Sequence, residues 1–435
     1  MSATPTIVPA DRFLGAPLVA AGGPDWLRDL RNQAAHRFAA TGLPTQRLEA
    51  WKYTDLRGLG KLTFAHADGI VDTRAAKSLL LDIDGPRLVF VDGRFSAELS
   101  RLDTLPAGVE LAPLSAVVSA DPARARSLFA QALPGDELPM IALNAAGLEE
   151  GAVIRVRRGI RVAAPLVVVF VGGTTPTPTA SRPRNRIEIE DGAEITILEH
   201  HVGPASASAF MNMVTDIALG AGATLRHGVL QDAAGGAYDL MTLRARVARD
   251  ATYESFTFAV GARLFRNDAS IRLQGPGAAC RVSGAYLLRG EQHCDNTTVI
   301  EHEQPHTTSR EVFKGVVDGR ARGVFQGRIV VHPGADKSDG HQLSKAILLS
   351  DTATVNAKPE LEIFADDVKC SHGATAGELD RQAMFYLRSR GIREARARSL
   401  LVEAFIAEAL EEVSDASLRA IFAARAARWY EGVPS

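Results

Sequence analysis

A thiol and an imidazole lie close together in the segment Ala365–Thr375, which reads A-D-D-V-K-C-S-H-G-A-T. Cys370 and His372 are two residues apart, so on a β-strand both side chains point to the same face and could meet one metal ion or sulfur species. An isolated Cys-x-His pair also occurs in purely structural roles. The pair is therefore a candidate metal or sulfur site, and its spacing leaves a structural role open.

A second pattern, His302-Glu303-Gln304-Pro305-His306, matches the H-E-x-x-H signature of zinc proteases. That chemistry needs both histidines on one face of a helix, one turn apart. Pro305 lies inside the motif and removes a helical hydrogen-bond donor, and the flanking sequence is typical of strands. We therefore reject a zinc-protease site here, while His293 and His302 stay candidates for a polar path inside the fold.

Other catalytic signatures are absent from the sequence. It contains no G-x-x-x-x-G-K-[ST] motif, so we expect this chain to bind no nucleotide, and it contains no G-x-S-x-G motif. Its three cysteines, Cys280, Cys294 and Cys370, are too few and too scattered for a disulfide framework or a four-thiolate metal site. Any metal bound through these cysteines needs other ligands or another chain. Cys280 and Cys294 are expected to lie in the core.

The overall composition is that of an ordered globular protein. Of 435 residues, 46% are hydrophobic and 23% are charged, and 49 basic residues balance 51 acidic ones. The chain thus lacks the basic excess that drives binding to nucleic acid. The apolar stretch Pro165–Gly173 is too short to span a bilayer, so we expect a cytoplasmic protein with no membrane contact.

Short strands with two distinct faces fill the chain from about residue 151 to 370. Small-residue turns punctuate them at Gly192-Ala193, Gly222-Ala223, Asp250-Ala251 and Gly277-Ala278, at intervals of roughly 28–30 residues. No long helical pattern interrupts the strands, which excludes an alternating β-α-β sheet and leaves a sandwich, a propeller or a parallel β-helix. The repeated interval favours the β-helix, in which stacked coils share one apolar interior.

Helices are expected on both sides of this region. Residues 24–40 have helical spacing, residues 87–93 read as a strand that ends in a turn, and a further helix is expected from Asp121 to Gly135. Beyond Gly377, a helix from 380 to 390 precedes two longer ones. Three helices cannot bury all of their apolar surface against one another. The β-region or a partner protein must therefore receive part of that surface.

These observations predict a mainly β fold, a parallel β-helix core flanked by an N-terminal α/β region and a C-terminal helical region. The expected domains are residues 1–140, 141–375 and 376–435.

Three segments resemble the SufD branch of the SufB/SufD family, which belongs to the bacterial SUF system for iron-sulfur cluster assembly. They are Lys358–Thr375, Phe385–Gly391 and, more loosely, Glu49–Asp55. With the domain order, the resemblance covers nearly the whole chain. The SufB counterpart of residues 370–375 typically lacks the Cys-Ser-His-Gly arrangement, so the SufD branch is the better match.

The resemblance implies a right-handed parallel β-helix and a scaffold subunit without catalysis of its own. It implies that the chain pairs with SufB through the β-helix and binds the SufC ATPase through its C-terminal helices. A nascent iron-sulfur cluster would form transiently at the SufB-SufD interface under the control of SufC. By the same resemblance, His372 is an iron or cluster ligand shared with SufB, and Cys370 is either a second ligand or a residue that aligns the strand. The candidate SufC-binding residues are Phe385, Tyr386 and Leu387.

Two alternatives stay open at this point. A SufB-type scaffold would hold a stable cluster by itself, which the low cysteine count disfavours. A carbohydrate-active β-helix enzyme would place carboxylates in an open groove and would bind oligosaccharides.

Overall fold

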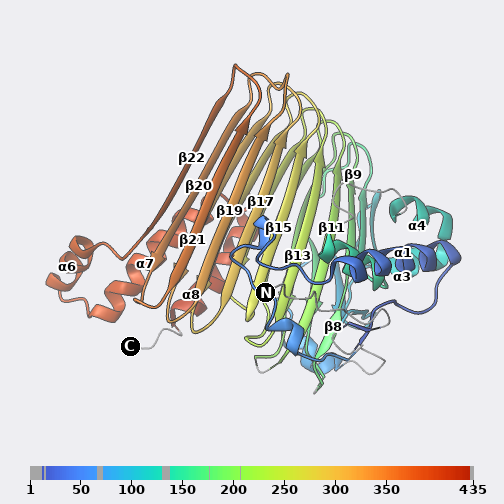
Figure 1. Ribbon diagram of the computed structural model, residues 1–435, viewed down its shortest axis with the longest axis horizontal. Helices are drawn as coiled ribbons and strands as arrows, with labels where there is room; N and C mark the ends of the chain where they lie inside the picture. The colour runs from blue at the N-terminus through green and yellow to red at the C-terminus, as the bar shows by residue number, and fades with distance from the viewer. Residues whose placement is uncertain are drawn as a thin grey trace, which may run out of the picture.

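Two long, mainly parallel β-sheets lie face to face and form the centre of the molecule (Figure 1). The computed structural model describes residues 12–13, 16–65, 72–129, 138–175, 177–205 and 207–431. From β9 onward, consecutive strands alternate between the two sheets, so each pair of strands completes one coil of a β-helix with about eight turns. The predicted β-helix core with helical flanks is confirmed.

Sheet 1 consists, in spatial order, of β22 (Lys369–Gly377), β20 (Asp339–Leu348), β18 (Thr308–Val317), β16 (Ala279–Leu288), β14 (Thr252–Ala259), β12 (Thr224–Asp232), β10 (Glu194–Val202), β7 (Leu166–Val171), β3 (Arg87–Val91) and β4 (Arg94–Phe95). Sheet 2 consists of β21 (Thr354–Ile363), β19 (Arg322–Val331), β17 (His293–His302), β15 (Leu264–Leu273), β13 (Tyr238–Val247), β11 (Ala209–Leu219), β9 (Arg184–Ile189), β6 (Ala152–Val156) and β5 (Val109–Pro113), with β8 (Thr179–Ser181) beside β11. A separate hairpin joins β1 (Arg12–Phe13) and β2 (Ala16–Pro17).

The repeated turns of the sequence lie one above another in the structure. Glu194 pairs with Thr224, and Thr224 pairs with Thr252, which are offsets of 30 and 28 residues. Gly222 and Asp250, in the turns that precede those strands, both have positive φ, and the Gly222 amide donates to the Arg249 carbonyl of the next turn. The interval in the sequence is therefore the length of one coil.

The N-terminal part combines helices with strands that extend the two sheets. β3 runs parallel to β7, and β5 runs antiparallel to β6, at the end of the β-helix far from β22. The N-terminal helical segments are α1 (Asp25–Thr41), η1 (Glu49–Trp51), η2 (Leu59–Lys61), α2 (Thr73–Lys77), α3 (Leu114–Ala120), α4 (Pro122–Phe129) and α5 (Pro139–Ala146). The helix expected from Asp121 to Gly135 corresponds to α4, and its expected continuation past residue 129 falls outside the described residues.

The segment Glu49–Asp55 crosses the outer face of sheet 2. The guanidinium of buried Arg266 lies 4.1 Å from the ring centroid of Trp51. Gln326 Nε2 donates to the Ala50 carbonyl at 3.2 Å, and Lys358 Nζ lies 2.6 Å from Glu49 Oε1. These contacts join the N-terminal part to three strands of sheet 2, namely β15, β19 and β21.

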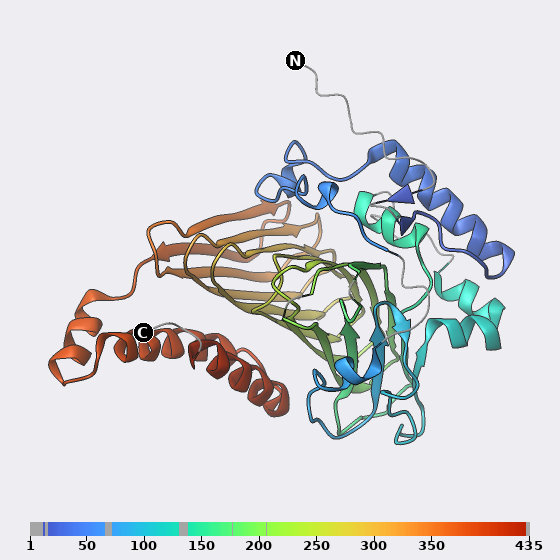
Figure 2. The ribbon, with the colours of Figure 1, turned by 90° about the horizontal axis from the view of Figure 1, so that it is seen from below.

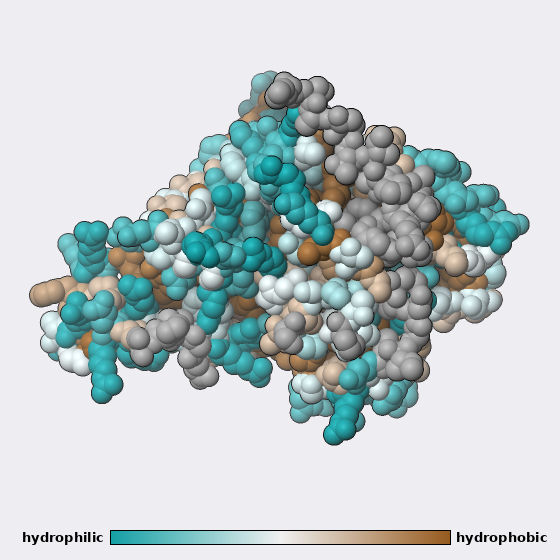
Figure 3. Space-filling view, turned by 60° about the horizontal axis from the view of Figure 1, so that its bottom comes forward, coloured by the Kyte–Doolittle hydropathy of each residue, from teal (hydrophilic) through white to brown (hydrophobic). Residues whose placement is uncertain are grey.

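Three C-terminal helices follow the last strand: α6 (Arg381–Ser389), α7 (Glu394–Leu410) and α8 (Ala416–Glu431). α7 and α8 run along the outside of the β-helix (Figure 2), where Phe422 packs 5.2 Å from Phe256 and 5.8 Å from Phe258, measured between ring centroids. Sheet 1 therefore receives much of the apolar surface of these helices. α6 instead projects from the end of the molecule, where Figure 3 shows hydrophobic and hydrophilic residues side by side.

No described helix combines the length and the apolar character needed to span a bilayer.

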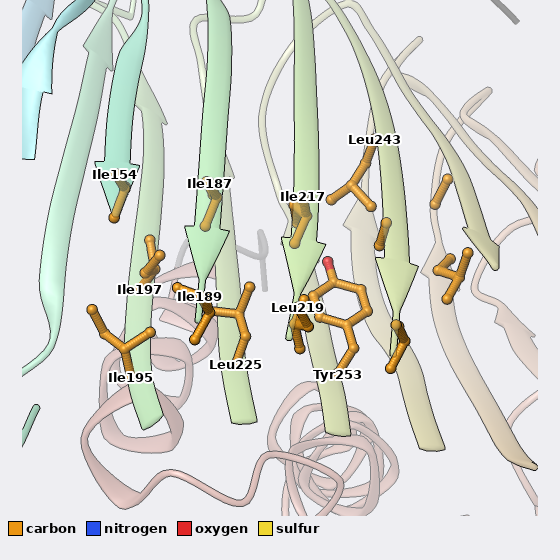
Figure 4. Close-up of a cluster of buried hydrophobic side chains, with 14 of the residues drawn as sticks. Ile154, Ile187, Ile189, Ile195, Ile197, Ile217, Leu219, Leu225, Leu243 and Tyr253 are labelled. Atoms are coloured by element: carbon orange, nitrogen blue, oxygen red, sulfur yellow. The ribbon is translucent and has the colours of Figure 1, made fainter. Parts of the chain in front are cut away.

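Inward side chains from both sheets fill the interior of the β-helix. Figure 4 shows Ile187 and Ile217 from sheet 2 together with Ile197 and Leu225 from sheet 1, in one layer between the strands. Because a coil has no core of its own, each inward row is buried only when the next coil stacks on it.

Tyr286 shows how tightly this interior is packed. Its ring fills the space over two glycines: a Cβ on Gly315 would lie 2.0 Å from Tyr286 Cζ, and a Cβ on Gly323 would lie 2.7 Å from Cε2. Both glycines are therefore needed for the large buried ring.

We predict that Gly315→Ala lowers the free energy of unfolding by about 1–3 kcal/mol, because the added methyl group overpacks a closed interior. The control is Gly235→Ala, where a Cβ would meet no atom within 4 Å. Urea unfolding followed by circular dichroism measures the difference. Equal midpoints for the two variants would show that Tyr286 can move away without cost.

Candidate functional site

The last coil of the β-helix exposes an open edge. β22 pairs with β20 in sheet 1, β21 pairs with β19 in sheet 2, and within the described residues no strand pairs with the far side of either. Those sides present free backbone donors and acceptors. Ile363 and Phe364, at the end of β21, are exposed apolar residues beside this edge.

Cys370 and His372 both belong to β22. By register, Cys370 pairs with Gly340 and His372 pairs with Gln342, and both positions continue inward-facing rows of sheet 1. Ser371, between them, points outward and bonds His341 Nδ1 at 2.6 Å. The structure thus brings the two predicted site residues to one side of the edge strand.

The two side chains differ in their surroundings. Cys370 is half-buried against a small apolar cluster that contains Ile329 and Val331, and burial raises the pKa of its thiol. His372 is exposed. The imidazole is thus open to a ligand or partner, whereas the thiol stays protonated near neutral pH unless a metal displaces the proton.

These two donors do not complete a metal site. Across the described part of the chain, no group of three or more His, Cys, Asp or Glu side chains is arranged to hold a metal ion. Structural zinc and iron-sulfur sites usually have four protein ligands. A metal or cluster at His372 would therefore need ligands beyond those that the described part of the chain brings together there.

The other cysteines and histidines singled out in the sequence lie elsewhere. Cys280 and Cys294 face the interior, as expected, and burial raises the pKa of both thiols. His302 also faces inward, where its ring nitrogens bond Thr307 Oγ1 and Ser309 Oγ, but His293 lies on the outer side against Thr54. Of the two histidines proposed for a polar path, only His302 is inside.

The rejected zinc-protease motif is not helical. His302 ends β17, and His306 lies in the following turn with a φ of 59°. The two histidines therefore do not share a helical face, as Pro305 predicted.

The sequence did not lead us to predict a buried ionic network inside the first coils. His201 Nδ1 lies 2.9 Å from Asp239 Oδ2 and its Nε2 lies 3.6 Å from Glu199 Oε2, while His227 lies 3.2 Å from both Glu199 and the Tyr253 hydroxyl. Burial alone would lower the pKa of His201, but the two carboxylates outweigh it and raise that pKa to about 9. The sequence signal for this network was the spacing Glu199-x-His201, which places both side chains on the same face of a strand.

The C-terminal residues proposed as a docking site are on α6. Phe385 is 75% exposed and Tyr386 is 57% exposed, while Leu387 is half-buried. Arg390 lies over the Tyr386 ring, 5.1 Å from its centroid. Two of the three residues thus present aromatic surface to solvent.

Comparison with known proteins links this architecture to one function. Residues 170–405 match the SufBD core domain of the SUF system for FeS cluster assembly, and residues 16–168 match the SufBD protein N-terminal region. The chain is 34% identical to the iron-sulfur cluster assembly protein SufD of Escherichia coli over 391 residues, 89% of each chain. It is 31% identical to an iron-sulfur cluster assembly SufBD family protein of Synechocystis over 399 residues, 89% of this chain and 88% of that one.

We predict that His201 makes stability depend on pH. Since its pKa is raised from about 6.5 in the unfolded chain to about 9 in the folded one, its contribution is complete below pH 6.5 and is lost as the pH rises through 9. His201→Gln should therefore cost about 1–3 kcal/mol more at pH 6 than at pH 9.5. Urea unfolding at both pH values tests this prediction, with the exposed His36→Gln as the control. If His201→Gln lowers the free energy of unfolding equally at both pH values, His201 is neutral in the folded chain.

Proposed function

The chain belongs to the SufB/SufD family and is a SUF-system subunit for iron-sulfur cluster assembly, and from this premise we propose that it is a non-catalytic scaffold, of the SufD type, for a nascent cluster. The observation that carries the proposal is the exposed His372 beside Cys370 on the open edge strand β22. There, a second chain can both cover the edge and supply the missing ligands.

We propose SufB as the chain that covers this edge. The unpaired sides of β21 and β22 offer backbone hydrogen bonds, and Ile363 and Phe364 offer apolar contact. A nascent cluster at the interface would then be shared, with His372 from this chain and a cysteine from SufB.

The choice of an imidazole suits a transfer site. Thiolates bind iron-sulfur clusters most firmly, and an imidazole is a weaker ligand from which a cluster can be released. Cys370 is a second candidate ligand, and its raised thiol pKa means that cluster binding there releases a proton. The cluster is cargo in this proposal, held only until a recipient accepts it.

We propose that SufC, an ATPase, binds α6 and the start of α7, and that it supplies the nucleotide chemistry that this chain lacks. Phe385 and Tyr386 are the exposed anchors expected for a protein interface. Since the helices that follow lie on sheet 1, movement of α6 would be transmitted toward the strands of the last coils. The proposed location of the complex is the cytoplasm.

The deciding experiment is the iron and sulfide content of the complex purified anaerobically with SufB and SufC, for the native chain and for His372→Ala. We expect the complex to form equally, with cluster affinity lowered at least about tenfold, because loss of even an indirect supporting group costs metal sites that much.

His341→Ala is the matched control, because His341 is an exposed histidine on the neighbouring strand that points outward. It should load like the native chain. If His372→Ala forms the complex and also loads fully, His372 is structural and the cluster site lies wholly on the partner.

We also predict that the double variant Phe385→Ala/Tyr386→Ala weakens SufC binding about 10- to 100-fold, because two aromatic anchors lose their contact area. Calorimetry of SufC binding measures this, with Phe364→Ala, an exposed aromatic beside the open edge, as the control. Unchanged affinity in the double variant would place the SufC surface elsewhere.

A further inference from the structure

A carboxyl group is buried inside the last coils of the β-helix. In sheet 1, Val282 on β16 pairs with Glu311 on β18. Glu311 pairs in turn with Gln342 on β20, and this inward-facing row ends at His372 on β22. Glu311 thus lies in the interior, two strands behind the open edge.

Glu311 has no positively charged partner among the described residues. Neither of its carboxyl oxygens has a hydrogen-bond partner, and no cationic side chain contributes to the shift in its pKa. Lys314, on the same strand, points outward to Glu408. His302 also faces inward, but burial lowers its pKa to about 4, so its ring is neutral near pH 7. A buried carboxylate without a counter-charge is strongly disfavoured, so a proton or a cation from solution must accompany this one.

Two further side chains bring oxygen atoms to this carboxyl group. They are Thr298, on β17 of sheet 2, and Gln342; like Glu311, both are at most 3% exposed. The Thr298 hydroxyl and the Gln342 amide oxygen have no hydrogen-bond partner. Both groups lie close enough to Glu311 to lower its pKa, although burial outweighs them and neither is aligned for a hydrogen bond to it. Oxygen atoms from both sheets therefore converge at one place in the interior.

Gly327 leaves the room in which these oxygens meet. It pairs with Thr298 in sheet 2. A Cβ at this position would lie 3.1 Å from Gln342 Cδ and 2.6 Å from Phe325 Cζ. The Gln342 side chain thus reaches across the interior to sheet 2 and lies beside Thr298.

The three donors are typical ligands of a hard monovalent cation. Carboxylate, hydroxyl and amide oxygens suit hard cations, whereas sulfur and imidazole suit softer metals. The site supplies a single negative charge. A monovalent ion makes it neutral, but a divalent ion would leave a net charge in a medium of low dielectric constant.

We propose that Glu311, Thr298 and Gln342 bind one alkali-metal cation, Na⁺ or K⁺, inside the last coils. The ion joins β18 and β20 of sheet 1 to β17 of sheet 2. It thereby stabilises the end of the β-helix at which no further described coil covers the interior. The proposal is independent of the proposed scaffold function, because it needs no ligand role for His372. The alternative occupant is internal water, with a proton on the Glu311 carboxyl group.

The first test is urea unfolding of the full chain at pH 8. Burial raises the pKa of the Glu311 carboxyl group to about 7, so most molecules carry the carboxylate at this pH. NaCl or KCl replaces choline chloride at constant ionic strength, which keeps the screening of surface charges equal. Above the dissociation constant, each tenfold rise in the bound cation should lower the unfolding equilibrium constant about tenfold. An unfolding midpoint that is the same in all three salts overturns the proposal.

Three variants show whether the effect comes from this site. Glu311→Gln keeps the shape of the side chain but removes its charge, and it should abolish the dependence on Na⁺ or K⁺. Thr298→Val removes one ligand and should weaken the cation at least about tenfold, because even indirect supporting groups cost metal sites that much. Glu362→Gln is the matched control, because Glu362 lies on β21 with its carboxylate toward Arg328; it should behave like the native chain. An equal cation dependence in Glu311→Gln and the native chain would mean a general salt effect and contradicts the proposal.

Direct binding decides the question even if a variant fails to fold. Equilibrium dialysis of the native chain uses radioactive sodium, or radioactive rubidium in place of potassium. The chain should bind one equivalent of at least one of these ions, and NaCl or KCl should displace it while choline chloride does not. Binding of neither ion contradicts the proposal. Displacement by MgCl₂ at a lower concentration than by NaCl and KCl also contradicts it, since the site would then favour a divalent ion.

Discussion

Each coil of this β-helix buries its inward row only by stacking on the next coil, and this requirement explains most of the molecule. At one end, β3 and β5 from the N-terminal part join the two sheets and cover the first coils. At the other end, β21 and β22 have no successor among the described strands. The chain therefore carries its half-buried thiol, its exposed imidazole and its free strand edges at the same place, the end where the stack of coils stays open among the described strands.

The C-terminal helices relate to this end in two ways. α8 is held on sheet 1 by aromatic packing around Phe422 and by the ion pair between Arg425 and Asp232. α7 is held there by the ion pair between its Glu408 and Lys314 on β18. α6 leaves the last strand and stays exposed, with Phe385 and Tyr386 at its surface. A partner on α6 and a partner on the open edge would thus act on one short stretch of chain, residues 369–389, which gives the proposed control by SufC a direct route to the cluster site.

The β-helix was predictable because its turn residues recur in the sequence at an interval equal to the length of one coil. Gly222 and Asp250 mark positions with positive φ that recur once per coil. The absence of helical patterns between residues 151 and 370 excluded an alternating β-α-β sheet, and the repeated interval favoured the β-helix over a sandwich or a propeller. Cys370 and His372 were predicted from their spacing and from the family resemblance. The row from Val282 to His372 and the network around His201 were not predictable, because they depend on the register between strands about 30 residues apart, which neither alternation nor composition determines.

The central claim is that His372 of this chain binds the cluster together with ligands from SufB. Pulsed EPR of the reduced, cluster-loaded complex, in which only this chain carries ¹⁵N-labelled histidine, tests it most directly. The account predicts a ¹⁵N coupling typical of a directly bound imidazole, present in the native complex and absent in the complex with His372→Ala. A loaded native complex without such a coupling would contradict it.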